Sequence, residues 1–372
     1  MRWADYFLRK GAELQTFWQS YLQEKRRDVL FVLGMGFDPR MCLGYDSLLK
    51  AGGEGKRDCI IAKFIEGNDS PTEKYKDQVQ ENMAKLKKLI PSGSNLQTKE
   101  IKMWSGDNRR ITSRSAGDFF SDISDFQSYS DIIIDVSAMP RTVFFSLIGK
   151  ALTLLDINEK ESGNRWSPNL FVLVSENAFL DSAIKDAGTD EDANYLHGFT
   201  STLEHEAFAG LPKIWIPTLG ENQAKQLSII AHKVSPEEVC PVLPMPAADP
   251  RRTDNLLIEY NELLFLEFMI EPRNFMYVAE QNPFDIYRAI HNTVCRYKTA
   301  LETLGGCQVV LSASSSKLLS IGALLAAYEL RDEKVGVINV ETRGYEIEDD
   351  ISTWNDRTIL FGMWLSGDCY RT

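Results

Sequence analysis

Short apolar runs of strand length alternate with longer helix-compatible stretches, and this alternation constrains the fold more than any other feature of the sequence. The first runs are DVLFVLGMG, DCIIAKFIEG and SDIIIDVSAM. Strands that read as continuous apolar runs are buried on both faces, which is typical of a parallel sheet covered by helices. We therefore predict an α/β protein.

The same alternation of apolar runs and helix-compatible stretches begins again after about residue 212, with runs such as KIWIPTLG, CQVVLSASSS and VGVINVETRGY. This predicts two Rossmann-like parallel-sheet halves that could derive from a duplication, and 372 residues are enough for two domains. The expected parts are an N-terminal helix (1–27), a first Rossmann-like domain (28–175), a connecting segment (176–212) and a second Rossmann-like domain (213–372).

Two local echoes favour the duplication. Ser137-Ala138 and then Arg141 follow the fourth strand of the first half, and Ser312-Ala313 and then Lys317 follow the fourth strand of the second. The tripeptide Asp-Pro-Arg also occurs twice, at 38–40 after the first strand of its half and at 249–251 after the second.

Charge and cysteine content narrow the function classes. The chain has 41 Lys and Arg against 53 Asp and Glu, a net charge of −12, which argues against broad nucleic-acid binding but leaves a local basic pocket open. Its six cysteines form no CxxC pair, which favours a reduced, cytoplasmic location. No apolar stretch is long enough to span a membrane, and neither a signal peptide nor a metal site is expected.

Ligands of an open parallel sheet bind beyond the carboxyl ends of its strands, so the turns there are the candidate site. In the first turn, Gly34 and Gly36 would allow close approach of a ligand. Asp38 could bind a ribose or cap the next helix, and Arg40 could bind a phosphate or pair with Asp38. The turn is neither a complete GxGxxG nor a P-loop.

The second turn holds Ser137, Arg141 and Thr142 at the start of an apolar helix, a setting that suits a phosphate or carboxylate. Asp135 ends the preceding strand, where a carboxylate is costly unless it is paired or used. The alternative is an ordinary helix cap, with Asp135 bonded to the neighbouring backbone.

The third turn is the clearest signal, because four serines and a lysine exceed what a helix cap needs. Ser312, Ser314, Ser315, Ser316 and Lys317 would suit an anion with several oxygens, such as a phosphate. The alternative is a solvated serine loop.

The fourth turn contains Tyr345, which could stack on a base, and Glu341, which could accept a hydrogen bond from a ribose or an amine. The alternative is a surface turn. No catalytic motif is visible, so whether the chain is an enzyme stays open, and no cofactor beyond a nucleotide ligand is indicated.

The turns DVSAMPRT and LSASSSKL resemble the ligand-binding turns of CARF-type Rossmann-like domains. Those domains pair so that two turns hold a cyclic oligonucleotide, and SAVED-type sensors resemble two such units in one chain. The resemblance implies a nucleotide or cyclic oligonucleotide between the halves. It also implies a role as the sensor or regulatory subunit of a bacterial protein assembly, such as an antiviral defence system.

Two other functions stay open. LGMGFDPR resembles the first glycine loop of S-adenosylmethionine-dependent methyltransferases, which would use residues 28–175, with Glu66 and Asp135 at strand ends. The third reading is a non-catalytic protein-interaction scaffold on the same frame.

Overall fold

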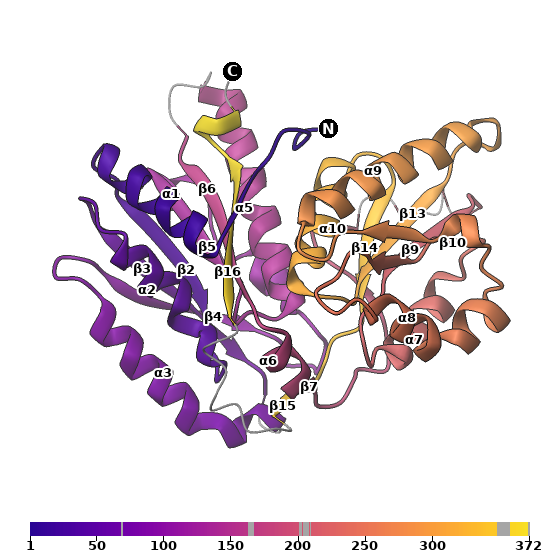
Figure 1. Cartoon of the computed structure of the whole chain (residues 1–372), viewed down its shortest axis with the longest axis horizontal. Coiled ribbons are helices and arrows are strands. Elements are labelled where there is room, and N and C mark those ends of the chain that lie inside the picture. The colour runs from indigo at the N-terminus through magenta and orange to yellow at the C-terminus, as the bar shows by residue number, and fades with distance from the viewer. Residues whose placement is uncertain are drawn as a thin grey trace. The chain divides into compact units, whose positions relative to one another are not determined.

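Two separate sheets organise the chain, as the computed structural model in Figure 1 shows. The chain divides into unit 1 (Met1–Asp5 and Thr189–Glu341) and unit 2 (Tyr6–Gly188 and Thr342–Thr372). Within the residues that the structure describes, helices of the length and apolarity that a bilayer crossing requires are absent. The structure describes all residues except 68–69, 163–166, 201–202, 204–207, 209, 348–357 and 371–372.

Unit 2 contains a seven-stranded sheet whose central strands are buried on both faces, as their apolar sequences predict. The strands β2 to β6 are mutually parallel, whereas β16 runs antiparallel to both of its neighbours, β6 and β1. The order across the sheet is β1 (Phe7–Lys10), β16 (Ile359–Ser366), β6 (Asn169–Glu176), β5 (Asp131–Asp135), β2 (Val29–Gly34), β3 (Arg57–Ile65) and β4 (Leu96–Lys102).

Helices cover both faces of this sheet. One face of β2, which includes Phe31 and Leu33, packs against Trp18 of α1 and Tyr45 of α2 in one core cluster, and Figure 1 shows α5 on the opposite side of the sheet from α1. A small ribbon of β7 (Ile184–Asp186) and β15 (Tyr345–Ile347) completes the unit. The helical segments of unit 2 are α1 (Gly11–Glu24), η1 (Pro39–Cys42), α2 (Leu43–Lys50), η2 (Pro71–Tyr75), α3 (Lys76–Leu89), α4 (Thr112–Gly117), η3 (Ile123–Phe126), α5 (Arg141–Ser162), α6 (Ala178–Ala183) and η9 (Asp368–Tyr370).

Unit 1 repeats this plan on a smaller scale. All strands of its sheet are parallel except β8, which lies antiparallel to β14 at one edge, and the short β10 (Glu238–Val239) also pairs with β9. The order across the sheet is β12 (Met276–Val278), β11 (Val242–Pro244), β9 (Lys213–Thr218), β13 (Gln308–Ala313), β14 (Val335–Asn339) and β8 (Asn194–Tyr195).

The helix α10 is central to unit 1, because every residue from Leu318 to Tyr328 is buried. Gly322 permits this burial, since a Cβ there would lie 2.1 Å from the Pro283 carbonyl oxygen of α9. Figure 1 shows α9 and α10 on one side of the sheet and α7 and α8 on the other. The helical segments of unit 1 are α7 (Ala224–Val234), α8 (Arg252–Glu259), the π-helical turn η5 (Glu262–Glu267), η6 (Pro272–Asn274), α9 (Pro283–Ala300), η7 (Glu302–Leu304) and α10 (Lys317–Glu329).

Both sheets place their parallel strands in the same order. Numbered along the chain within each unit, the five strands lie as 3-2-1-4-5, followed by an antiparallel strand next to the fifth. The predicted α/β class with two Rossmann-like halves is therefore confirmed, and the shared order agrees with an internal duplication.

The predicted domain boundaries need correction at both ends of the chain. Residues 1–27 do not form one helix, because Met1–Asp5 belongs to unit 1 while β1 and α1 belong to unit 2. Residues 342–372 were assigned to the second domain, but they belong to unit 2, because β16 pairs along β6. The predicted connecting segment 176–212 contributes β7 to unit 2 and β8 to unit 1.

Candidate functional site

Each unit has a topological switch point where ligands of such sheets bind. The chain leaves the first strand in one direction and returns on its other side for the fourth, so β2 and β5 are neighbours in unit 2, and β9 and β13 in unit 1. The crevice beyond the carboxyl ends of these strands is the expected binding position. The turns at Asp135–Thr142 and Ser312–Lys317 therefore both lie at switch points, one in each unit.

In unit 1 the turn after β13 packs directly on the turn after β9. The Ser314 backbone N–H donates to the Thr218 hydroxyl at 2.9 Å, and that hydroxyl donates to the Ser312 carbonyl at 3.2 Å. A Cβ added at Gly220 would lie 2.1 Å from the Ser314 carbonyl oxygen. Only glycine at position 220 allows the two backbones to approach this closely.

The predicted hydroxyls of this turn divide into two groups. Ser312 is buried and accepts a hydrogen bond from Trp215 Nε1 at 3.0 Å, which gives it a structural role, and Ser314 is also buried. Ser315, Ser316 and Lys317 are half-buried at the start of α10, but the hydroxyl oxygen of Ser315 is itself buried. Ser316 is the N-cap of that helix, because its hydroxyl accepts the Leu319 N–H at 3.3 Å.

The start of α10 is a favourable place for negative charge. The unpaired N–H groups of a first helical turn carry the positive end of the helix dipole. Because α10 is buried from Leu318 to Tyr328, protein rather than water surrounds this dipole, and water screens it less. The ammonium of Lys317 adds a full positive charge to the same turn.

The neighbouring strand ends of unit 1 carry a charged cluster that the sequence analysis did not predict. Arg252 of α8 forms a forked pair with Glu221, at 2.7 and 2.9 Å, and also pairs with Glu280. Glu280 accepts the Ala248 N–H at 2.7 Å. This cluster ties together the segments after β9, β11 and β12, and its single guanidinium offsets one of the two carboxylate charges. The signal was present in the sequence, since Glu221 directly follows the glycine that ends KIWIPTLG.

In unit 2 the corresponding turn uses its polar groups internally. The Ser137 hydroxyl donates to Asp135 Oδ1 at 2.5 Å and accepts the Ser175 N–H at 2.8 Å. Asp135 also accepts the Ser137 backbone N–H at 2.9 Å, and both side chains are buried. The structure thus gives Asp135 and Ser137 the role that the alternative reading described, a carboxylate bonded to the adjacent turn.

Gly34 and Gly36 lie against the same turn. A Cβ at Gly34 would lie 2.8 Å from the Ala138 carbonyl oxygen, whereas one at Gly36 would keep 3.8 Å from it. The contact of Gly34 with Ala138 corresponds to that of Gly220 with Ser314 in unit 1.

These contacts correct the register of the predicted echo. Ala138 faces Gly34 at the end of β2, and Ser314 faces Gly220 just beyond the end of β9; each lies three residues before its helix starts at Arg141 or Lys317. Ser137 therefore corresponds to Ala313 and not to Ser312. The alignment by residue type was wrong by one position, because serine occurs on both sides of Ala313.

Arg40 forms a buried ion pair within unit 2. Its guanidinium donates to both Asp38 carboxylate oxygens, with the shortest contact at 2.7 Å, and also to Asp181 at 2.8 Å and to the Ser175 carbonyl at 3.1 Å. Burial opposes its charge, but Asp38 and Asp181 outweigh burial and raise the pKa of Arg40. Of the two predicted roles for Arg40, the structure shows the pair with Asp38.

The second Asp-Pro-Arg, at 249–251, has the same aspartate cap as the first, but its arginine side chain is not buried. The Asp249 side chain accepts the Arg251 N–H at 2.9 Å, as Asp38 accepts the Arg40 N–H at 2.9 Å. The Arg251 side chain is exposed, whereas that of Arg40 is buried.

Arg141 and Thr142 begin α5. Arg141 is half-buried, and burial lowers its pKa, while Asp186 and Tyr345 act in the opposite direction. Thr142 is buried, and its carbonyl accepts the Ser146 hydroxyl at 3.1 Å.

The predicted fourth turn is divided between the units. Glu341 ends the unit 1 segment beyond β14, whereas Tyr345 lies in β15 opposite Asp186 of β7 in unit 2. Glu341 and Tyr345 both follow β14 as predicted, but Tyr345 does not belong to the second domain, because the chain enters unit 2 at Thr342.

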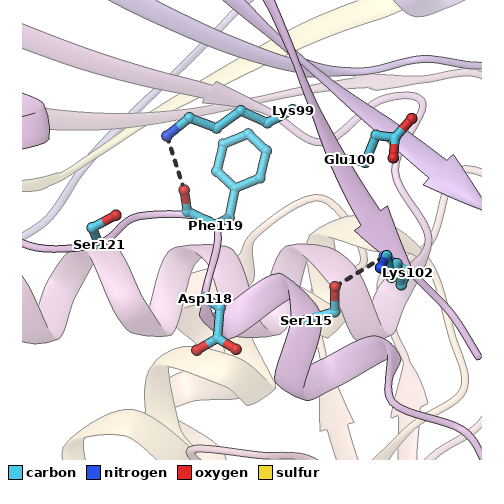
Figure 2. Close-up of a pocket in the computed structure, with 7 residues that line it drawn as sticks. All are labelled: Lys99, Glu100, Lys102, Ser115, Asp118, Phe119 and Ser121. Atoms are coloured by element: carbon cyan, nitrogen blue, oxygen red, sulfur yellow. Dashed lines mark hydrogen bonds between the residues drawn. The ribbon is translucent and has the colours of Figure 1, made fainter. Parts of the chain in front are cut away.

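A surface pocket of about 440 Å³ lies elsewhere in unit 2, between the edge strand β4 and α4 (Figure 2). Lys99 Nζ donates to the Phe119 carbonyl at 3.1 Å, and the Lys102 N–H donates to the Ser115 hydroxyl at 2.9 Å, as Figure 2 shows. These bonds attach the α4 segment to the sheet edge, and none of the pocket residues belongs to the predicted site. Among the described residues, no group of three or more His, Cys, Asp or Glu could hold a metal ion.

No protein-family model matches the sequence, and no curated protein matches it. Solved structures with some likeness include a protein described as a universal stress protein from Pseudomonas aeruginosa UCBPP-PA14. It is 11% identical, with 85% of this chain and 93% of that chain covered and a TM-score of 0.21. A universal stress protein from Archaeoglobus fulgidus is 8% identical, with 85% and 97% covered and a TM-score of 0.21. A functionally unknown protein from Pseudomonas aeruginosa PAO1 is 12% identical, with 83% and 91% covered and a TM-score of 0.20. At these TM-scores the likeness carries no argument, and the fold rests on the strand order itself.

Proposed function

We propose that unit 1 binds a phosphate-bearing small molecule, a nucleotide or cyclic oligonucleotide, at the turn between β13 and α10. The observation that carries the proposal is the position of Ser315, Ser316 and Lys317. These residues are half-buried at the switch point, at the start of a helix that is buried along its length. A phosphate there would receive backbone N–H groups, the Ser316 hydroxyl and one ammonium, all from a single turn.

The equivalent turn of unit 2 is a weaker candidate. It has Met139, Pro140 and Arg141 where unit 1 has Ser315, Ser316 and Lys317, so only the cation is kept. The Ser137 hydroxyl is already bonded to Asp135 and Ser175. An anion would also meet the negative charge of Asp135 close by, which is unfavourable at short range.

We further propose that ligand binding makes this chain a sensor or regulatory subunit of a bacterial, cytoplasmic protein assembly, such as an antiviral defence system. The support is the resemblance of LSASSSKL to the ligand turns of CARF-type domains, together with the absence of a recognisable catalytic motif from the sequence.

The test is a binding titration of the full chain with four probes: inorganic phosphate, ATP, a cyclic oligoadenylate and S-adenosylmethionine. We expect ATP or the cyclic oligoadenylate to raise the melting temperature by mass action and to give a binding isotherm in calorimetry. Lys317→Ala should weaken that binding by about 1–3 kcal/mol, or about 5- to 150-fold, because it removes a charged hydrogen bond.

The matched control is Lys225→Ala, because Lys225 is an exposed lysine at the start of α7 in the same unit. It should leave binding unchanged. Equal affinities of Lys317→Ala and wild type would refute the site. A response to S-adenosylmethionine alone would point to the methyltransferase reading, and no response to any probe would favour the scaffold.

A further inference from the structure

Four exposed apolar side chains lie on α8 and the π-helical turn η5 that follows it. Ile258, Leu266 and Met269 are 75%, 72% and 75% exposed, and Phe265 is 40% exposed. Of the ten large hydrophobic side chains that are exposed in the described part of the chain, these four fall within twelve residues. Single exposed hydrophobics are common, but a cluster marks an interaction site. We call the surface formed by Ile258, Glu262, Phe265, Leu266, Glu267 and Met269 the α8 patch.

Helix geometry gathers these side chains on one face. Leu256, Tyr260 and Leu264 are buried at intervals of four and fix the inward face. Positions 258 and 262 alternate with these buried residues, and position 266 follows Leu264 by two; all three are exposed and lie on the outward side. The α8 patch therefore has Ile258 on one side of Glu262 and the apolar group of Phe265, Leu266 and Met269 on the other.

The backbone of this segment is also unusual. The Phe268 N–H donates to the Leu263 carbonyl, five residues earlier, at 3.0 Å, which is the π-helical pattern. Met269 then adopts a φ of +47°, a left-handed conformation that a bulky side chain rarely takes. Single π turns occur frequently at functional sites. Here the turn ends the helix with a methionine displayed to solvent, where a glycine would be the ordinary choice.

Acidic side chains surround the apolar side chains of the α8 patch. Asp254, Glu259, Glu262 and Glu267 are all exposed. Among the described residues, none forms an ion pair with Asp254, Glu262 or Glu267. The surface therefore combines apolar contact area with uncompensated negative charge.

We propose that the α8 patch docks a basic amphipathic helix of a partner protein. The apolar face of such a helix would cover Leu266 and Met269, and its lysines or arginines would meet Glu262 and Glu267. Charge argues against the other occupants: an anionic lipid surface would be repelled, and a second copy of this chain carries a net charge of −12 and the same acidic rim. This inference deepens the partner part of the proposed function and does not involve the ligand turn.

The test uses two synthetic 18-residue peptides with identical leucine faces, one with lysine and one with glutamate on the polar face. Fluorescence anisotropy with the full chain, without nucleotide, should show binding of the lysine peptide only, weakened at high salt because exposed charges are screened. Leu266→Ser should weaken binding at least tenfold. Met269→Gly should also weaken it, and this variant keeps the fold because glycine accepts the left-handed conformation. The matched control is Leu304→Ser, another leucine that is exposed at 62% in unit 1.

The charge-reversed variant Glu262→Lys/Glu267→Lys separates docking from a stability effect, because it should lose the lysine peptide and gain the glutamate peptide. Equal binding of the two peptides, or lysine-peptide binding that all these variants leave unchanged, would overturn the proposal. Self-association by sedimentation, or binding to lipid vesicles, that Leu266→Ser abolishes would instead assign the α8 patch to a second copy or to a membrane. Because nucleotide titration is a separate assay, failure here leaves the ligand site standing.

Discussion

Removing the Arg40 guanidinium should destabilise unit 2 strongly. Arg40 is 3% exposed, and its guanidinium contacts three partners: Asp38 through two nitrogens, Asp181 and the Ser175 carbonyl. Arg40→Ala leaves the buried carboxylate of Asp38 without its counter-charge. Breaking a buried pair on one side costs about 3–5 kcal/mol.

The contacts that remain in Arg40→Ala place the expected loss of stability at the lower end of that range. Asp38 keeps its bond to the backbone N–H of residue 40 at 2.9 Å, and Asp181 is half-exposed, so its pair contributes little. A loss of about 3 kcal/mol in a unit of roughly 200 residues corresponds to a fall of about 6–12 °C in melting temperature. Because the pair is buried, 0.5 M NaCl should change this difference little.

The assay is differential scanning calorimetry of wild type, Arg40→Ala and Arg251→Ala at pH 7. Arg251 is the matched control, because it ends the same tripeptide with the same cap but has an exposed side chain. Its removal should change stability by no more than about 0.5 kcal/mol. If Arg40→Ala melts within 2 °C of wild type, the ion pair is not what holds this turn. If that variant also loses nucleotide binding, Arg40 has the ligand role that the sequence left open.

Three further outcomes can be checked. Gly322→Ala should destabilise unit 1 by about 1–3 kcal/mol in urea unfolding, since its Cβ would lie 2.1 Å from the Pro283 carbonyl oxygen, whereas Gly106→Ala, with open space around it, should not. The pKa of Glu329 is lowered from its ordinary 4.5, because bonds from Tyr287 and Arg2 outweigh its burial. The unfolded chain therefore binds the proton more readily, so the stability that Glu329 contributes is present above pH 4.5 and is lost as the pH falls through the lower pKa of the folded state. At that low pH a Glu329→Gln variant should approach wild-type stability. A stability difference that stays constant down to pH 3 would contradict this. At pH 8 a thiol reagent should label Cys295 first. Cys295 and Cys369 are both exposed and the other four cysteines are buried, but partial desolvation of the Cys369 thiol raises its pKa to about 12; rapid labelling that persists in Cys295→Ser would contradict this.

The sequence predicts features that depend on a local residue pattern, such as buried strands, and does not predict which distant strands pair with one another. The apolar runs from Val29 to Gly34 and from Gln308 to Ala313 predicted buried parallel strands correctly, because burial on both faces removes the alternation of polar residues. Residues 359–366 fall in the predicted second domain, but they form β16, which lies between β6 and β1 in the sheet of unit 2. Nothing in its composition specifies a partner nearly 200 residues away.

The same distinction applies to the candidate site. Residue type alone predicted that Ser312 and Ser316 would lie between a strand and a helix; Ser316 does, but Ser312 lies within β13. Residue type could not show that Trp215 donates a hydrogen bond to Ser312 or that Ser316 caps α10, because both bonds depend on how the turns pack against each other. Thr218 and Gly220 were overlooked for that reason, since their importance appears only when the turn after β9 meets the turn after β13.

The placement of β16 has a consequence for how the protein is made. Phe7 of β1 pairs opposite Trp364, and β1 has no other neighbour in its sheet. Because β16 follows both β1 and β6 in the chain, these two strands are synthesised before the strand that pairs with them. Until β16 is made, β1 lacks this partner and one edge of β6 is unpaired, which is the kind of open edge that other chains can pair with, and deletion of β16 would expose both strands together.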